Sequence, residues 1–319
     1  MKRKKTEEAR FFVARESELL AALTRIFSRG TDDAVIVGIG DDAAVVKASL
    51  TPLALATDMA VEGTHFNRNW SSLYEIGAKV TAANFADIFA MGGQPEYLLV
   101  AAALPKNFTV EEIEELALGI YDEAASVGAL VVGGDLTYSE RIVISISVFG
   151  SVARPLLRSG AHVGDRVLLS RLTGESAAGL AILQRGILDG DSAEHRNPTV
   201  EYEKAQAISS IAHSLTDVSD GLISELSQIA DASHVQIEID RELLQSSEGF
   251  SRLASLATEH GCDVWEWILH GGEDHVFLAT VPSGVTIPSG FIEIGRVVAG
   301  SRVLVDGFIA EHQGFTHFE

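Results

Sequence analysis

The sequence has few cysteines and few positive charges for its length. Its 319 residues include one cysteine, so the chain can form no internal disulfide and contains no CxxC metal-binding motif. Lysine and arginine together number 24 against 45 aspartates and glutamates, which gives a formal net charge of −21. This excess of negative charge would repel a nucleic-acid backbone, so we predict that nucleic acid is not a partner.

Long hydrophobic runs and several common catalytic motifs are also missing. No apolar run approaches the roughly 20 residues that a membrane-spanning helix needs, and the N-terminal MKRKKTEEARFF is charged where a signal peptide is apolar. We therefore expect a cytoplasmic protein that does not bind a membrane. The chain has no GxxxxGKS/T phosphate-binding loop, no HExxH zinc helix, no GxSxG nucleophile turn and no protein-kinase HRD or DFG motif. Any phosphate chemistry must then rest on metal held by carboxylates.

Hydrophobic periodicity and turn residues predict an α+β fold with two domains. Helices are predicted over 16–28, 72–91, 109–128 and 175–184, and strands over 34–40, 43–46, 53–57, 97–105, 129–132 and 142–150. Beyond residue 155 we expect a polar loop through DGDSAEHRNP, two helices flanking DVSDG and several late strands. We predict an N-terminal domain of residues 1–150, a C-terminal α+β domain of residues 151–319, and ligands in the cleft between them.

Aspartates follow apolar segments at several places in the N-terminal half. Asp41 and Asp42 lie in GIGDDAAVV, Asp58 in LALATDM and Asp135 in VVGGD, each at the predicted end of a strand. One such aspartate is ordinary turn chemistry. Four of them in apolar surroundings would repel one another and lose hydration, so they indicate a site that cations neutralise. Oxygen ligands of this kind favour Mg²⁺.

GIGDDA also fits the dinucleotide-binding pattern GxGxxA. That motif requires a helix that begins at the glycines, whereas the following AAVVKASLTPLALAT contains β-branched residues and a proline and predicts strand, turn and strand. Two carboxylates in the loop would also repel a pyrophosphate unless a metal lay between them. We therefore reject dinucleotide binding.

Two further segments each allow a structural and a functional interpretation. Asn84 and Asp87 are three residues apart on one face of a predicted helix, either as a solvated face or as ligands. In TDVSDG, either Ser219 or Asp217 caps the following helix, or Asp217 and Asp220 hold metal-bound phosphate at its start.

The remaining candidates are an acidic pair and two residues suited to anions. Glu273 and Asp274 in HGGED form a glycine-flanked pair before a strand, with the same two interpretations. His65 in VEGTHF and Arg158 in RSGAHVGD can contact anionic ligands, although either residue type also serves structural roles in loops.

Eight segments in order resemble the thiamine-monophosphate kinase family: GIGDDAAVV, ATDMAVEGTHF, AANFADIFAMGG, VVGGD, RSGAHVGD, SAAGLAIL, DVSDGL and GGED. The resemblance covers nearly the whole chain after residue 30. It implies the two-domain architecture of the aminoimidazole ribonucleotide synthetase superfamily, in which the N-terminal sheet pairs across a homodimer. It also implies transfer of phosphate from ATP to thiamine monophosphate, with several Mg²⁺ ions and thiamine diphosphate as the product.

The resemblance also assigns residues. It implies metal binding by Asp42, Thr57, Asp58, Asp87, Asp135, Asp217 and Asp220. It implies contacts to ATP from Gly134, Asp135, Arg158 and Ser219, and to thiamine monophosphate from His65, Glu273 and Phe315. No general base is expected, because a phosphate acceptor with a second pKa of roughly 6 is largely ionised at neutral pH.

Four positions depart from the family pattern. Ala56 replaces a hydroxyl residue, and Leu136, Tyr138 and His275 replace polar or aromatic neighbours of the motifs. Ala56 removes one possible metal ligand, but the changes leave the predicted magnesium site nearly whole and bear mainly on the acceptor. Two alternatives therefore stay open: an ATP-dependent enzyme of the same superfamily with another acceptor, and a non-catalytic nucleotide-binding dimer.

Overall fold

The N-terminal part of the protein is built on a four-stranded sheet. The structure, a computed structural model, describes residues 15–30, 32–40 and 43–310. The sheet has the order β3-β6-β4-β5, in which β4 and β5 are parallel and the other pairs antiparallel. Its strands are Leu53–Val61 (β3), Gln94–Leu104 (β4), Leu130–Tyr138 (β5) and Val143–Ser151 (β6). A small ribbon of β1 (Val35–Val37) and β2 (Val45–Val46) precedes it.

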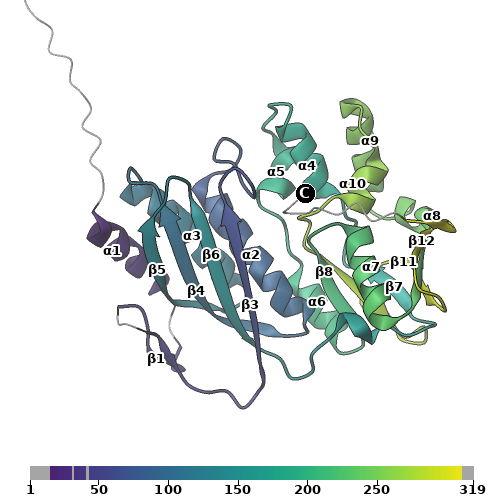
Figure 1. Ribbon diagram of the computed structural model, residues 1–319, viewed down its shortest axis with the longest axis horizontal. Coiled ribbons are helices and arrows are strands. Elements are labelled where there is room, and N and C mark those ends of the chain that lie inside the picture. Colours follow the sequence, from purple (N-terminus) through teal and green to yellow (C-terminus); the bar gives the residue numbers. More distant parts are fainter. Residues whose placement is uncertain (1–14, 31, 41–42, 311–319) are drawn as a thin grey trace, which may run out of the picture.

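Three helices pack on one face of this sheet: α1 (Glu16–Phe27), α2 (Leu73–Ala90) and α3 (Val110–Ser126) (Figure 1). The helix predicted over 109–128 is confirmed as α3, and a capping box fixes its start. The Thr109 hydroxyl accepts a hydrogen bond from the Glu112 N–H, and the Glu112 carboxylate accepts one from the Thr109 N–H. Ser72 and Glu75 form the same motif at the start of α2. No described helix has the length and apolar content needed to cross a membrane.

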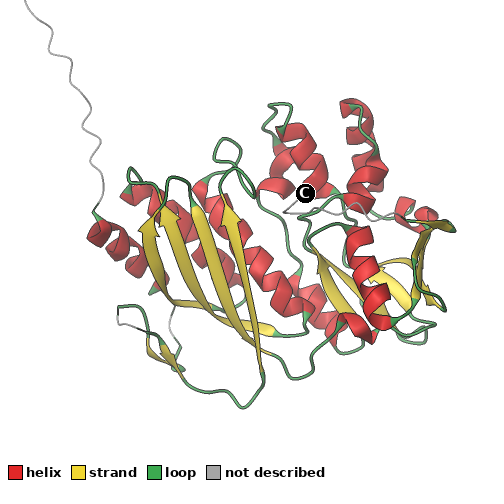
Figure 2. Cartoon of the chain, in the orientation of Figure 1, coloured by secondary structure: helices red, strands yellow, loops and turns green. Residues whose placement is uncertain are grey.

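The opposite face of the four-stranded sheet, here called the outer face, carries exposed apolar side chains. Alternation along β3 directs Ala54, Ala56 and Ala60 toward the helices and leaves Leu53, Leu55 and Met59 57%, 65% and 58% exposed. Figure 2 shows the helices behind the sheet and no described element in front of it. The outer face is therefore open in the single chain.

The C-terminal part contains a seven-stranded sheet in the order β13-β12-β9-β11-β7-β10-β8. Its strands are Arg166–Leu169 (β7), Ser214–Val218 (β8), Gln236–Ile239 (β9), Val276–Val281 (β10), Ile292–Val298 (β11), Val303–Val305 (β12) and Phe308–Ile309 (β13). Its helices are Arg158–Gly160 (η1), Glu175–Leu183 (α4), Gly190–Ser192 (η2), Ala193–Arg196 (α5), Tyr202–Ser209 (α6), Leu222–Ser233 (α7), Arg241–Gln245 (α8), Phe250–His260 (α9) and Val264–His270 (α10). The predicted α+β fold is confirmed.

The two parts share a hydrophobic core. One cluster joins Phe85 and Phe89 of α2 to Ile208 of α6 and to Phe277 and Val281 of β10. A second cluster lies wholly in the C-terminal part, between its sheet and α4, α7, α9 and α10. Packing on both sides therefore fixes the cleft that lies between α2 and the C-terminal end of β8, just before α7.

One sequence-based prediction about the C-terminal part is wrong, and one strand was missed. The segment DGDSAEHRNP contains the short helices η2 and α5 where a polar loop was predicted. Helices α6 and α7 flank DVSDG as predicted, but the unpredicted strand β8 lies after α6 and includes the first two residues of the motif. Residues 214–218 are strand because they pair antiparallel with 276–280, a partner 60 residues away, and all five are buried. The local sequence SLTDV contains no pattern that predicts this pairing.

Candidate active site

Three aspartates from three different elements form what we call the carboxylate cluster: Asp58 of β3, Asp87 of α2 and Asp217 of β8. Burial raises the pKa of Asp87 to about 7, and the negative charges of Asp217 and Asp58 add to that rise. The pKa of Asp58 is also raised, first by burial and then by Asp217, with His275 and His65 opposing. These two raised pKa values show that the carboxylates of the cluster are close together and only partly neutralised by neighbouring positive groups.

Asn84 positions Asp58 and Asp87 relative to each other. Its side-chain oxygen accepts a 3.0 Å hydrogen bond from the Asp58 N–H, and its amide donates to the Val80 carbonyl oxygen at 2.9 Å. Asn84 is fully buried, so the solvated-face interpretation is wrong for this residue. The amide fixes β3 onto α2, and Asp87 follows one helical turn later.

Backbone hydrogen bonds join the motif DVSDG to the segment GGEDH. The Glu273 N–H donates to the Ser219 carbonyl oxygen at 2.7 Å, and the His275 N–H donates to the Val218 carbonyl oxygen at 3.0 Å. A Cβ on Gly272 would lie 2.6 Å from that same Ser219 oxygen, so only glycine allows this approach. Glu273 and His275 have φ of 63° and 49°, a conformation costly for such residues and concentrated at functional sites.

His275 is held against the carboxylate cluster. Its Nδ1 lies 3.0 Å from an Asp217 oxygen. Burial alone would lower the pKa of His275, but the hydrogen bond and charge of Asp217 outweigh burial and raise it. Asp217 itself is 4% exposed and belongs to β8. The N-cap position of helix α7 is Gly221, so the capping interpretation of Asp217 and Ser219 is wrong.

Glu225 and Arg158 extend the charged region along α7. The Glu225 carboxylate is buried and lies 3.2 Å from an Arg158 nitrogen. Burial raises the pKa of Glu225 to about 7; Arg158 lowers it, while Asp217 and Asp220 raise it. The Arg158 side chain is 46% exposed, so it can also contact an anionic ligand. Sequence analysis missed Glu225, although an acid within the apolar run LISEL is itself a signal.

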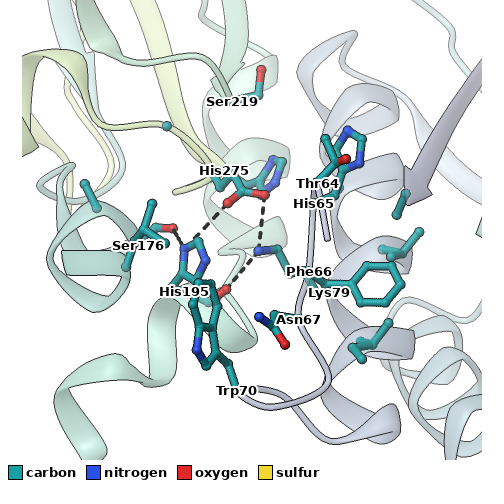
Figure 3. Close-up of a pocket in the computed structure, with 18 of the residues that line it drawn as sticks. Thr64, His65, Phe66, Asn67, Trp70, Lys79, Ser176, His195, Ser219 and His275 are labelled. Carbon is teal, nitrogen blue, oxygen red and sulfur yellow. Dashed lines mark hydrogen bonds and ion pairs between the residues drawn. The ribbon is translucent and has the colours of Figure 1, made fainter. Parts of the chain in front are cut away.

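A cavity of about 810 Å³ opens beside the carboxylate cluster. Its wall includes these predicted or newly found residues: Asp58, His65, Phe66, Trp70, Lys79, Ser176, His195, Ser219, Asp220, Glu273 and His275. Figure 3 shows Lys79, from α2, directed toward His195 of α5, with Trp70 below and His65 across the cavity. The His65 Nδ1 accepts a 3.0 Å hydrogen bond from the Val61 N–H, which fixes the ring after β3.

A buried lysine and a glutamate face each other in the cavity wall. The Lys79 Nζ lies 3.2 Å from a Glu273 oxygen and donates to the His195 carbonyl oxygen at 2.9 Å. Burial would raise the pKa of Glu273, but Lys79 and His195 together lower it. Burial and Lys79 lower the pKa of His195 to about 4, so His195 is neutral at pH 7 and Lys79 is the cation of the group. Sequence analysis missed Lys79 and His195 because their partners are distant in sequence.

The acidic pair at 273–274 divides between two roles. Asp274 is fully buried and accepts hydrogen bonds from the N–H groups of Gly174, at 2.7 Å, and Ser176, at 2.9 Å. Burial raises its pKa to about 6 against the opposing effect of Arg171. Asp274 thus holds the start of α4, whereas Glu273 faces the cavity.

Asp135 and Gly134 are not brought to the carboxylate cluster within one chain. Residues Asp58, Ile146, Val100 and Gly134 form one row across the sheet. The row crosses three strand spacings, so Asp58 and Gly134 are roughly 14 Å apart. A Cβ on Gly134 would lie 1.9 Å from the Val100 carbonyl oxygen, which explains this glycine structurally.

The predicted position of Asp58 and Asp135 at strand ends is wrong. Both lie inside their strands, Asp58 opposite Ile146 and Asp135 opposite Ala101, because the hydrogen-bonded ladders continue past them. Thr57 points to the outer face and its hydroxyl donates to the Ile146 carbonyl oxygen at 3.0 Å. Asp41, Asp42 and Phe315 lie outside the described residues.

Comparison with known proteins identifies the family. The AIR synthase related protein family matches with its N-terminal domain over residues 40–152 and its C-terminal domain over residues 162–269. Thiamine-monophosphate kinase of Mycobacterium tuberculosis is 38% identical over 279 residues, which cover 86% of this chain and 83% of that protein. The chain belongs to the thiamine-monophosphate kinase family.

Further members of the thiamine-monophosphate kinase family agree. The Corynebacterium glutamicum enzyme is 39% identical over 272 residues, 81% of this chain and 80% of its own. A solved structure, AaThiL complexed with AMPPCP and TMP, superposes with a TM-score of 0.80 at 32% identity, over 96% of this chain and all of the other. The similarity to these relatives thus extends over both parts of the chain.

The four departures from the family pattern lie in different places. Ala56 and Leu136 pack against the shared core, and Tyr138 lies on β5 beneath the Lys106 ammonium, 4.7 Å from the ring centre. None of these three belongs to the cavity wall. His275 does, and it contacts Asp217, so this departure bears on the carboxylate cluster as much as on the acceptor.

Without divalent cations, the protein should lose stability relative to Asp87→Asn as the pH rises from 3.8 to about 7. The folded state raises the pKa of Asp87 from 3.8 to about 7, so it keeps a proton that the unfolded state releases in this range. The stabilisation that Asp87 contributes is fully present below pH 3.8, its pKa in the unfolded state. It is lost as the pH rises through about 7, its pKa in the folded state. Thermal unfolding in chelator from pH 4 to 8 measures the difference. Parallel curves for the two proteins would contradict it.

Lys79→Met should destabilise the protein by about 1–3 kcal/mol, because Glu273 then keeps a charge without its partner. The effect is smaller than for a fully buried pair, since the Glu273 side chain is 37% exposed. Urea unfolding measures it, with Lys47→Met as the control because Lys47 is an exposed lysine away from this pair. Equal stability of Lys79→Met and wild type would refute the role of the pair.

Proposed function

We propose that this protein transfers the γ-phosphate of ATP to thiamine monophosphate and so forms thiamine diphosphate. The carboxylate cluster beside an 810 Å³ cavity is the observation that carries the proposal. It is supported by relatives named thiamine-monophosphate kinase at 38% and 39% identity and by the related complex with AMPPCP and TMP.

The cavity offers separate contacts for the two ends of the acceptor. Trp70 and Phe66 present aromatic faces, to which a cationic thiazolium ring binds with about 0.5–2 kcal/mol. His65 and Lys79 supply polar and positive groups for the phosphate, and Glu273 orients Lys79 through the 3.2 Å ion pair. These contacts align an acceptor whose phosphate oxygen is already ionised, so positioning replaces a general base.

The donor side lies next to the carboxylate cluster. Arg158 is anchored to Glu225 at 3.2 Å and keeps an exposed face for ATP phosphates. The carboxylates fit Mg²⁺: they are oxygen ligands, and the pKa values of Asp58 and Asp87 are raised by burial and by the neighbouring carboxylates despite the opposing effect of His275. We propose that Asp58, Asp87 and Asp217 hold it, with Asp220 beside them. Bound Mg²⁺ supplies charge neutralisation for two polyanions that must approach each other.

We also propose a homodimer in which the outer face of one sheet meets that of a second copy. The exposed Leu53, Leu55 and Met59 supply the apolar surface for this contact. The described sheet has β3 and β5 as opposite edges, with Asp58 on one and Asp135 on the other. Closure of two sheets would place β3 of each copy beside β5 of its partner. Asp135 and Gly134 would then complete the site of the second copy.

The test is incubation of purified protein with ATP, Mg²⁺ and thiamine monophosphate, followed by detection of thiamine diphosphate as its fluorescent oxidation product. Product from the monophosphate and none from free thiamine is expected, because only the monophosphate presents a phosphate nucleophile. ATP turnover with another phosphorylated acceptor alone would assign a sister activity. ATP binding without turnover on any acceptor would indicate a non-catalytic nucleotide-binding dimer.

Four sequence-based predictions are not tested by these observations. The division into residues 1–150 and 151–319, the binding roles assigned to the site residues, the cytoplasmic location and the lack of a nucleic-acid partner stay predictions.

A further inference from the structure

A second group of metal-binding side chains lies at the other end of β8. His162 and Asp165 belong to the loop between η1 and β7, and His213 directly precedes β8; we call them the histidine cluster. His213 and Asp217 are four residues apart along extended chain, so roughly 13 Å separates the histidine cluster from the carboxylate cluster. The two groups are therefore separate sites.

The donor atoms of the histidine cluster converge. The Nδ1 atoms of His162 and His213 are 3.2 Å apart, and the His213 Nδ1 lies 3.0 and 2.9 Å from the two Asp165 oxygens. The ligand atoms all lie within 4.8 Å of one another. A tetrahedral Zn²⁺ with bonds of 2.0–2.1 Å holds its ligand atoms roughly 3.3 Å apart. The spacings from His213 to His162 and to Asp165 are already close to that value, and the remaining spacing is within 4.8 Å.

The hydrogen bonds within the histidine cluster do not give every lone pair a hydrogen of its own. The Asp165 carboxylate only accepts hydrogen bonds, so the His213 Nδ1 must carry the proton that bonds to it. The His162 Nδ1, 3.2 Å from the same nitrogen, then presents its lone pair to that single hydrogen. One cation in place of the proton would satisfy all three lone pairs, and two imidazoles with one carboxylate are typical ligands of Zn²⁺.

The backbone holds the histidine cluster in place. The His162 N–H donates to an Asp165 oxygen at 2.9 Å, and the Asp165 N–H donates to the His162 carbonyl oxygen at 3.0 Å. Pairing with Val297 fixes this turn, and the His213 N–H donates to the Thr280 carbonyl oxygen at 2.8 Å. The Asp165 side chain is 4% exposed, whereas that of His213 is 34% exposed, so the site has an anchored carboxylate and an open side.

We propose that the histidine cluster is a binding site for Zn²⁺ or a similar divalent transition metal, with water in the open position. The ion would tie the loop that carries Arg158 to the strand that carries Asp217. It would thereby stabilise the relative placement of two segments of the cleft from outside it.

The experiment uses full-length protein without an affinity tag, freed of metal with a chelator and titrated with Co²⁺ and Zn²⁺ in millimolar Mg²⁺. Visible absorption of bound Co²⁺ reports nitrogen ligands, and calorimetry gives affinity. We expect His162→Ala and His213→Ala to weaken binding by about 10- to 100-fold or more. His260→Ala, which removes a histidine of α9, and Asp58→Asn, which alters the carboxylate cluster, should both retain the tight site.

The same proteins give a second readout. Zn²⁺ should raise the thermal midpoint of wild type and of His260→Ala, and raise that of His162→Ala much less. Because His162 is exposed, its replacement should leave the midpoint in chelator unchanged, which separates lost binding from lost folding. The proposal is overturned if wild type binds no Co²⁺, if His162→Ala binds it equally well, or if Asp58→Asn abolishes the signal.

Discussion

Replacing Asp58 by asparagine should abolish phosphate transfer while the fold stays intact. Asp58 belongs to the carboxylate cluster, and Asn84 holds its backbone through the 3.0 Å hydrogen bond that the substitution does not touch. Loss of one charged ligand should lower kcat by about 100-fold or more, since charge stabilisation in a desolvated site is the largest single contribution of that kind. Steady-state thiamine diphosphate formation at saturating Mg²⁺ measures the loss.

The stability of Asp58→Asn provides an internal check. Burial and Asp217 raise the pKa of Asp58, so its ionised form is disfavoured in the metal-free fold and asparagine should stabilise the protein in chelator. Mg²⁺ with ATP should protect wild type more than Asp58→Asn. Asp231→Asn, an exposed position on α7, is the matched control and should behave as wild type. Full activity of Asp58→Asn would contradict the assignment of Asp58 as a metal ligand.

Two inactive variants should restore each other when they are combined in one dimer. In the proposed dimer each site takes Asp58 from one chain and Asp135 from the other. A heterodimer of Asp58→Asn and Asp135→Asn then has one intact site and one site with both substitutions. It should show about half of the wild-type activity, because symmetry gives the dimer two equivalent sites. Co-expression with two different tags and sequential purification isolates it.

A second heterodimer makes that result specific. Asp58 and Asp217 both contribute to the carboxylate cluster of one chain. Combining Asp58→Asn with Asp217→Asn therefore damages both sites and should restore nothing. Recovery in neither heterodimer would show that Asp135 does not act across the interface, and recovery in both would show a different division of the site.

Local signals predicted helices α2 and α3 of the N-terminal part, of which α2 carries Asp87, but they did not predict β8, which carries Asp217. The capping boxes at Ser72 and Thr109 act within one helical turn, so the sequence alone placed α2 and α3. The cost of an aspartate among apolar neighbours is also local, and it pointed to Asp58 and Asp87 before their proximity was visible.

What the sequence could not predict depends on distant pairing. Asp217 is a buried strand residue because β10 pairs with β8 across about 60 residues of chain. The separation of Asp135 from Asp58 depends on the strand order β3-β6-β4-β5. The short apolar runs that predict the individual strands do not predict the order in which those strands pair. Lys79 was overlooked because its partners, Glu273 and His195, come from elements more than 100 residues later.

The shared core has a consequence for how the molecule comes apart. Phe277 and Val281 of the C-terminal sheet are fully buried in the same cluster as Phe85 of α2. Cutting the chain after β6 would expose that apolar surface on both fragments, so neither half should persist alone as a folded monomer. Unfolding should accordingly be one cooperative event for the joined region, with amide hydrogens of α2 and β10 exchanging at the same slow rate. Ligand binding in the cleft would then slow exchange in both halves alike.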